Sequence, residues 1–220
     1  MTAPILVMAV GNESRGDDAL GPLLARRLET WLTSMANATT NNEMTMHHES
    51  FPHPCPLPPA GEGDTETRFA SSTLMNAWLG EQVEVIEEFQ LQVEHTLDIQ
   101  GRTLVLIIDA GHNTQTPFSF YEAKARKLDG HTTHAVAPEA LLGIYAAVHR
   151  ELPPPAFILC VAGMSFELGE PLSPPAEQHL EQAFVFCQQL FHAPAQNEWL
   201  EIAGRQISLK KQSGIKEYAA

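Results

Sequence analysis

Hydrophobic and polar residues alternate along this chain in blocks that predict strands and helices in turn. Three short runs are apolar at almost every position, which is typical of strands buried on both faces of a sheet. These runs are PILVMAV (4–10), RTLVLIIDAG (102–111) and PAFILCVAG (155–163). Two further runs, QVEVIEEFQL (82–91) and FSFYEAKARKL (118–128), alternate only partly, and the second is predicted to lie nearer a sheet edge.

The first apolar run is followed by a polar loop and then by leucines at helical spacing. The pattern predicts a helix over 17–33, with the arginines and glutamate of that stretch on its wet face. Either Asp17 or Asp18 is expected to cap the helix, because a carboxylate accepts the free N–H groups of a first turn.

Later segments predict more helices and one hairpin. Apolar periodicity indicates helices over 138–151 and 173–193, each with proline in its first turn. Residues 93–100 are expected to form either a short helix or a loop, and the tail over 197–220 is interpreted as a hairpin about Gly204.

Strands that alternate with helices predict an α/β fold, with a mostly parallel twisted sheet between helix layers. The length of 220 residues favours one domain over 1–220. Residues 35–80 are rich in Pro, Asn, Thr, Gly and His, and we expect a mobile surface insertion there. The tail over about 195–220 is atypical. In such sheets, ligands bind at the carboxyl ends of the strands.

The composition limits the partners. A formal net charge of −14 argues against nucleic acid and against an anionic membrane, because both attract Lys and Arg. Cys55, Cys160 and Cys187 are far apart, and the last two are expected to be reduced core residues. The first residues, MTAPILVMAVGN, have neither a basic segment nor an apolar run long enough for export. We therefore expect a cytoplasmic protein, and a monomer.

Acidic residues at strand ends are the main candidates for chemistry. Asp18 follows the first strand, Asp109 ends a central strand, and His134 precedes a helix. Two carboxylates and an imidazole suit nickel, zinc or a similar divalent ion and leave coordination positions open for a substrate. His112 is a rival to His134 because it lies just beyond Asp109, and His192 closes a helix where a cation is favoured.

Other site types find less support. Gly11, Gly16 and Gly21 have a GxxxxGxxxxG spacing that matches neither a P-loop nor GxGxxG, and the adjacent aspartates would repel a phosphate. No GxSxG elbow is present, and Cys160 lies inside a predicted strand. A pair of aspartates acting as general acid and base stays open.

Four segments, taken in order, resemble the hydrogenase maturation endopeptidases, which process the large subunit of [NiFe] hydrogenases. They are VMAVGNESRGDDALGPLLARRLE, LVLIIDA, TTHAVAPEALLGIY and VAGMSFELGEPLSP. EEFQLQVEHTLDI and GMSFELGEPLS resemble most the branch serving NAD-coupled, bidirectional hydrogenases. The chain departs from the family pattern in having Asp where Glu is frequent at the first acid, and EEFQLQ where a glycine-rich segment is common.

The resemblance implies a phosphorylase/hydrolase-like α/β fold and an aspartyl-type endopeptidase that activates its target by processing. Such an enzyme removes a C-terminal extension from the precursor large subunit after nickel has been loaded into that precursor. Carried over by motif, Asp18 and Asp109 are catalytic and metal-contacting, and His134 completes the metal triad. A further set belongs to the substrate loop: Gly11, Asn12, Asp17 and Gly21.

The resemblance leaves two mechanisms open. Nickel is expected to arrive with the substrate, and other divalent metals can occupy the same ligands. The metal would polarise the scissile carbonyl, or a carboxylate would activate water. An alternative from another class is a non-enzymatic chaperone that binds nickel or the large subunit on the same fold.

Overall fold

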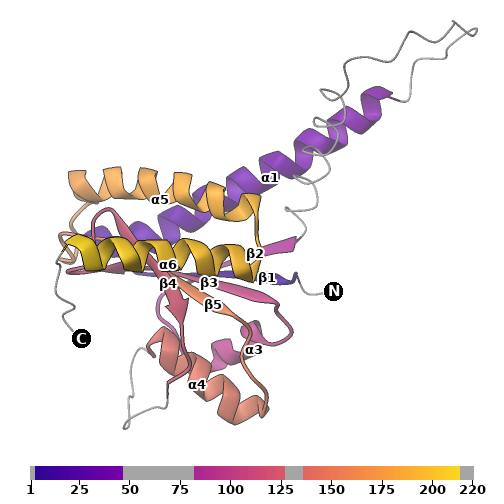
Figure 1. Cartoon of the computed structure of the whole chain (residues 1–220). Coiled ribbons are helices and arrows are strands. Elements are labelled where there is room, and N and C mark those ends of the chain that lie inside the picture. The colour runs from indigo at the N-terminus through magenta and orange to yellow at the C-terminus, as the bar shows by residue number, and fades with distance from the viewer. Residues whose placement is uncertain (1–2, 47–81, 127–135, 214–220) are drawn as a thin grey trace, which may run out of the picture. The chain divides into compact units, whose positions relative to one another are not determined.

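The computed structural model describes residues 3–46, 82–126 and 136–213 of the chain. These residues divide into two compact units, Met1–Leu28 with Val83–Ala220, and Glu29–Gln82. The sheet and the candidate site lie in the first unit (Figure 1). The predicted domain, over 1–220 with an insertion at 35–80, stays a prediction.

A five-stranded sheet forms the centre of the first unit, in the order β2-β1-β3-β5-β4. Its strands are β1 (Ile5–Val10), β2 (Val83–Glu88), β3 (Leu104–Gly111), β4 (Phe118–Ala123) and β5 (Ala156–Ala162). Neighbouring strands pair in parallel except β4, which runs antiparallel to β5 at one edge. The predicted α/β class and mostly parallel sheet are therefore confirmed, as is the edge position of the 118–128 strand.

Helices cover both faces of this sheet. They are η1 (Gly16–Ala19), α1 (Leu20–Met46), η2 (Val93–His95), α3 (Thr96–Ile99), α4 (Pro138–His149), α5 (Pro174–His192) and α6 (Gln196–Ser213). The part of α1 through Leu28 lies on one face with α5 and α6, and α3 and α4 lie on the other (Figure 1). Over the described ranges, no helix combines the length and the hydropathy needed to cross a bilayer.

The pleat of the strands divides the core into two layers. On the α3 and α4 face, Met8, Ile107 and Ile158 stand in register on adjacent strands and pack with Leu141 and Tyr145. Asp109 and Cys160 share this face, because they lie two residues beyond Ile107 and Ile158 and successive side chains alternate. The face that carries Asp109 is thus apolar along most of its length.

The start and the length of α1 differ from the prediction. The chain enters the helix through the 3-10 turn η1, whose N-cap is Arg15, so neither Asp17 nor Asp18 caps it. The helix also runs to Met46, beyond the predicted break at 35. The sequence from Leu23 to Met46 contains neither glycine nor proline, the two residues that disfavour a helix most. The helix can therefore continue through a polar stretch that lacks helical spacing of apolar residues. Residues 47–81 of the predicted insertion lie outside the described residues.

The tail forms a helix, so the predicted hairpin about Gly204 is wrong. The anchor of α6 is Trp199, which has no exposed surface and packs edge-on against Phe120, Phe157 and Phe191. Its indole N–H donates to the carbonyl of Leu190 at 3.1 Å. Burial of one large aromatic outweighs the weak helical preference of a glycine.

Replacing Trp199 with alanine is expected to lower the free energy of unfolding by about 3–5 kcal/mol, because a large buried side chain is lost and a cavity remains. Chemical denaturation followed by circular dichroism measures this change. Glu198→Ala, an exposed site on the same helix, is the control and should change stability by less than about 0.5 kcal/mol. Equal stabilities of the two variants would contradict the packing of α6 described here.

Candidate functional site

The candidate site lies at the carboxyl ends of the parallel strands. Asn12 and Asp18 belong to the segment after β1, and Asp109 lies two residues before Gly111, the last residue of β3. Because β1 and β3 are adjacent and parallel, both acids come from the same edge of the sheet. This is the edge at which open α/β sheets bind ligands.

Asp18 and Asp109 are close enough to affect one another. The half-buried Asp18 accepts a hydrogen bond from the backbone N–H of Asn12 at 3.2 Å. Asp109 accepts one from the N–H of Ala110 at 2.8 Å. Burial, followed by the negative charge of Asp18, raises the pKa of Asp109 to about 7 despite the bond from Ala110. Near neutral pH, Asp109 therefore exists in both protonation states.

Asp17 has a different environment from its neighbour, because it has no exposed surface. Its Oδ2 accepts hydrogen bonds from the N–H groups of Met164 at 2.6 Å and Ser165 at 3.0 Å. The N–H and the hydroxyl of Ser173 both donate to the same carboxylate at 2.7 Å. Burial alone would raise the pKa of Asp17, but these hydrogen bonds outweigh burial and lower it. Asp17 therefore holds the loop that carries Asp18, and it faces the protein interior.

The glycines of the first motif allow close packing of this loop. Gly11 has φ +153°, and a Cβ added there would lie 2.0 Å from the carbonyl oxygen of Asp18. A Cβ on Gly21 would lie 2.1 Å from the carbonyl oxygen of Val10. Side chains at these two positions would displace the loop from the sheet, so both glycines position Asp18. Asn12 supports the turn from within, because its Oδ1 accepts the N–H of Ser14 at 2.9 Å.

The predicted histidine ligand, His134, lies outside the described residues. The first described residue after this gap is Val136, whose N–H donates to the carbonyl of Leu91 at 3.0 Å. Of the rivals, His112 is exposed and its ring lies 4.0 Å from that of Phe166, and His192 bonds to the carbonyl of Gln188 within α5. Within the described ranges, no three His, Cys, Asp or Glu side chains are grouped as a metal site.

Two neighbours of Asp109 were missed by sequence reasoning as site residues. Cys160 stands directly opposite Asp109 in the β3–β5 register, and its thiol is half-buried. Tyr121 of β4 shares the same sheet face, and burial, then the charges of Glu139, Cys160 and Asp109, raise its pKa to about 12. The alternation within each strand could have found both residues, but only once the strand order was known.

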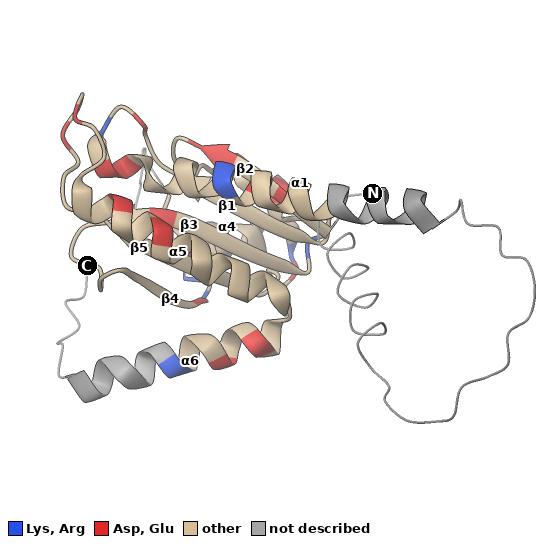
Figure 2. Ribbon diagram, turned by 90° about the horizontal axis from the view of Figure 1, so that it is seen from above, with Lys and Arg blue, Asp and Glu red and all other residues tan. Residues whose placement is uncertain are grey.

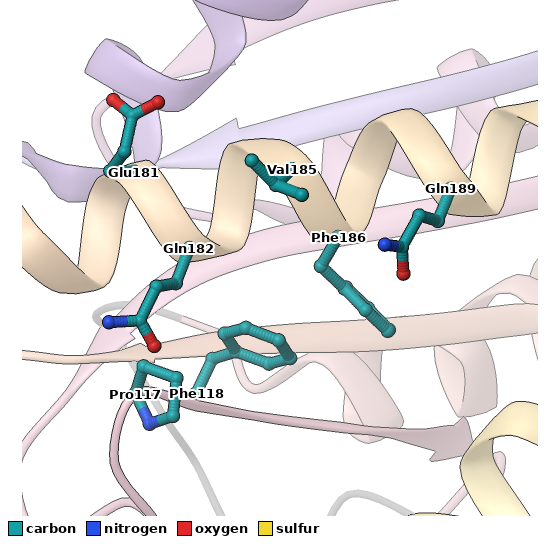
Figure 3. A pocket seen from close by; sticks show the side chains of 7 residues that line it. All are labelled: Pro117, Phe118, Glu181, Gln182, Val185, Phe186 and Gln189. Carbon is teal, nitrogen blue, oxygen red and sulfur yellow. The ribbon is translucent and has the colours of Figure 1, made fainter.

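A separate pocket of about 360 Å³ lies between the start of β4 and α5 (Figure 3). It is lined by Pro117, Phe118, Glu181, Gln182, Val185, Phe186 and Gln189. Phe118 pairs with Val161, and Asp109 pairs with the preceding residue, Cys160. Because successive side chains of a strand point to opposite faces, Phe118 stands on the sheet face opposite Asp109. This pocket is thus distinct from the carboxylate site.

The fold is similar to that of solved [NiFe] hydrogenase maturation proteases. HycI from Thermococcus kodakarensis KOD1 has a TM-score of 0.51 and 17% identity, covering 86% of this chain and 93% of that protein. The maturating endopeptidase HybD from E. coli has a TM-score of 0.46 and 18% identity, covering 96% of this chain and 94% of that protein. HybD from Thermococcus kodakarensis has a TM-score of 0.47 and 14% identity, covering 84% of this chain and 97% of that protein. No protein-family model and no curated protein matches the sequence.

The similarity to HycI covers most of both chains, and it shows that this chain has the α/β fold of that protein. The resemblance inferred from the sequence motifs is thus confirmed at the level of the fold. At this identity, the roles of individual residues do not follow from the comparison.

Replacing Asp17 with asparagine is expected to lower the free energy of unfolding by about 3 kcal/mol, because an amide cannot accept from donors on both of its terminal atoms. The lowered pKa means that the carboxylate contributes fully above its unfolded-state pKa and that this contribution is lost in acid. Urea unfolding at pH 7.5 measures the difference. Glu167→Gln, an exposed acid in the loop that Asp17 holds, is the control. Equal stability of both variants would mean that these hydrogen bonds do not form.

Asp109 is expected to reduce stability as the pH rises. Its folded-state pKa of about 7 lies above the unfolded value of 3.8. The free energy of unfolding therefore falls as the pH rises from about 3.8 to about 7, because over this range the folded protein keeps a proton that the unfolded chain has released. From pH 6 to pH 8, the wild-type protein should lose about 1 kcal/mol more than Asp109→Asn. Parallel denaturant titrations at the two pH values measure this difference. If both proteins lose the same amount, the pKa of Asp109 is not raised.

Proposed function

We propose that this chain is a cytoplasmic endopeptidase that removes a C-terminal extension from the nickel-loaded precursor of a [NiFe] hydrogenase large subunit. The proposal depends above all on the pair of carboxylates, Asp18 and Asp109, which two adjacent strands bring together at the ligand-binding edge of the sheet. The fold similarity to HycI, a [NiFe] hydrogenase maturation protease, supports the choice of reaction.

The pair has the chemistry that peptide hydrolysis needs. A carboxyl with a pKa of about 7 can take a proton from an attacking water at neutral pH and return it to the leaving amine. Water is consumed, the peptide C–N bond breaks, and a new carboxylate and a new amine leave. Burial of Asp109 keeps that proton affinity high, and the negative charge of Asp18 adds to it.

Nickel enters this proposal as part of the substrate. Asp18 and Asp109 offer carboxylate oxygens, and His134 is proposed as the third ligand on the basis of its place in the sequence motif. Three such ligands leave coordination positions for the groups that hold the ion in the precursor. The ion would then select loaded precursors, and it would either polarise the scissile carbonyl or orient it for water activated by a carboxylate.

A processing assay tests the proposal. Purified protein is mixed with nickel-loaded and with nickel-free precursor large subunit, and the subunit mass is followed by mass spectrometry. We expect loss of a C-terminal peptide only from the loaded precursor. Asp109→Asn should slow processing at least about 100-fold, because the proton-transfer group is removed while the side-chain volume is kept. Asp98→Asn, the same substitution on α3, is the control and should process at the wild-type rate.

The outcomes separate the two classes of function. Unchanged processing by Asp109→Asn would reject the site. A wild-type protein that binds the loaded precursor without shortening it would favour the non-enzymatic chaperone. Release of peptide from both precursors alike would retain the protease and reject the role of nickel in substrate selection.

A further inference from the structure

Backbone hydrogen bonds connect the loop after β5 to the loop after β1, which carries Asp18, and connect the end of β1 to the end of β2. The N–H of Gly169 donates to the carbonyl of Ser14 at 2.7 Å, which joins the loop after β5 to the loop after β1. The N–H of Gly11 donates to the carbonyl of Glu88 at 3.0 Å, which joins the end of β1 to the end of β2. The loops after β1 and β5 are therefore fixed to one another beside the candidate site, and the end of β2, from which Phe89 follows, is fixed to the end of β1.

This surface exposes large apolar side chains. Three of the eight exposed large hydrophobic residues in the described chain lie in the loops directly after β2 and β5. Phe89 is 65% exposed, Met164 59% and Leu168 77%. We call these three residues the apolar rim. All three follow carboxyl ends of strands, the end of the sheet that carries the candidate site, and exposed apolar residues among polar neighbours are typical of surfaces that bind another polypeptide.

The charges around the apolar rim are mostly acidic. Arg26 of α1 bonds to both Glu13 and Glu87, and Figure 2 shows this part of α1 in blue beside the red end of β2. The loop after β5 carries Glu167 and Glu170, which are exposed and form no ion pair with any described residue. A partner that covers this loop therefore meets uncompensated negative charge.

We propose that the apolar rim and the acids of the loop after β5 form the docking surface for a polypeptide segment that is basic and carries apolar side chains. This inference rests on the proposed function, because a substrate that docks here presents its chain to Asp18 and Asp109. Burial of the rim supplies most of the affinity, and Glu167 and Glu170 select for Lys or Arg in the partner and speed its association. An anionic lipid surface or a nucleic acid is repelled by the same charges.

Binding to the nickel-loaded precursor large subunit, measured by biolayer interferometry, tests the surface separately from the chemistry. The variant Phe89→Ser/Leu168→Ser removes two rim side chains that are already exposed, so it should fold normally. It is expected to raise Kd at least about tenfold. The matched control is Leu152→Ser. Leu152 is 90% exposed and precedes β5, so it lies at the amino ends of the strands, away from the candidate site. The Kd of this control should stay within about twofold of the wild type.

Charge reversal tests the selection of a basic partner. Glu167→Lys should weaken binding several-fold at low salt, and the difference from wild type should shrink near 0.5 M NaCl because ions screen exposed charges. Glu198→Lys, an exposed acid on α6, is the matched control. Equal effects of the two reversals would reject charge selection by this loop and attribute the effect to net charge alone.

The proposal and the proposed function fail in distinguishable ways. Asp109→Asn should lose cleavage of the precursor whatever its Kd, because the proton-transfer group is gone, whereas the double rim variant should raise KM and keep kcat. A double variant that binds within twofold of the wild type would overturn the docking surface and leave the protease untouched.

If the wild-type protein neither binds nor cleaves the precursor, the proposed function fails and a second probe decides the surface. That probe is a labelled ten-residue peptide of alternating Lys and Leu, with its Glu–Leu counterpart as control. Loss of Lys–Leu binding in the double rim variant, with binding kept in Leu152→Ser, would support the docking surface. Equal binding by the two variants, or equal binding of both peptides, would overturn it.

Discussion

One buried carboxylate holds together the end of the sheet at which the candidate site lies. Asp17 has no exposed surface, and it accepts hydrogen bonds from two residues after β5 and from the residue that begins α5. A carboxylate loses its hydration on burial, and only several well-placed donors can compensate that cost. The donors must therefore stay in place, which fixes the loop after β5 and the start of α5 relative to the loop after β1.

This constraint allows two adjacent aspartates to have opposite roles. Hydrogen bonds lower the pKa of Asp17 and keep it charged as a structural anchor. The next residue, Asp18, is half-buried, and its charge adds to the burial of Asp109, which is the main cause of the raised pKa of Asp109. Ionisation of such a buried carboxyl is unfavourable, because it places a second negative charge nearby. The anchoring bonds of Asp17 offset that cost within the same loop.

Elements that are fixed by residues close together in the sequence could be predicted from it, and elements that are fixed by long-range contacts could not. Continuous apolar runs were sufficient to find β1, β3 and β5, because a strand buried on both faces has no polar alternative. The hairpin predicted at Gly204 was wrong because the burial of Trp199 against β4 and β5 is a long-range contact. Neighbouring residues with the same side chain, such as Asp17 and Asp18, cannot be assigned different environments from sequence. Tyr121 and Cys160 join the site only through strand order, which local pattern does not encode.

The structure also explains why the glycine-rich loop before α1 carries two acids and does not form a phosphate-binding loop. The turn η1 has already used its backbone donors: the N–H of Gly16 bonds to Glu170, that of Asp17 to Ser165 and that of Asp18 to Arg15. A phosphate at this point would find no free N–H in these three residues, and it would face two aspartates. The glycine spacing therefore serves close packing of the loop against the sheet. Under the proposed function, this end of the sheet attracts a positive group, either a metal ion held by the substrate or a basic side chain of the substrate.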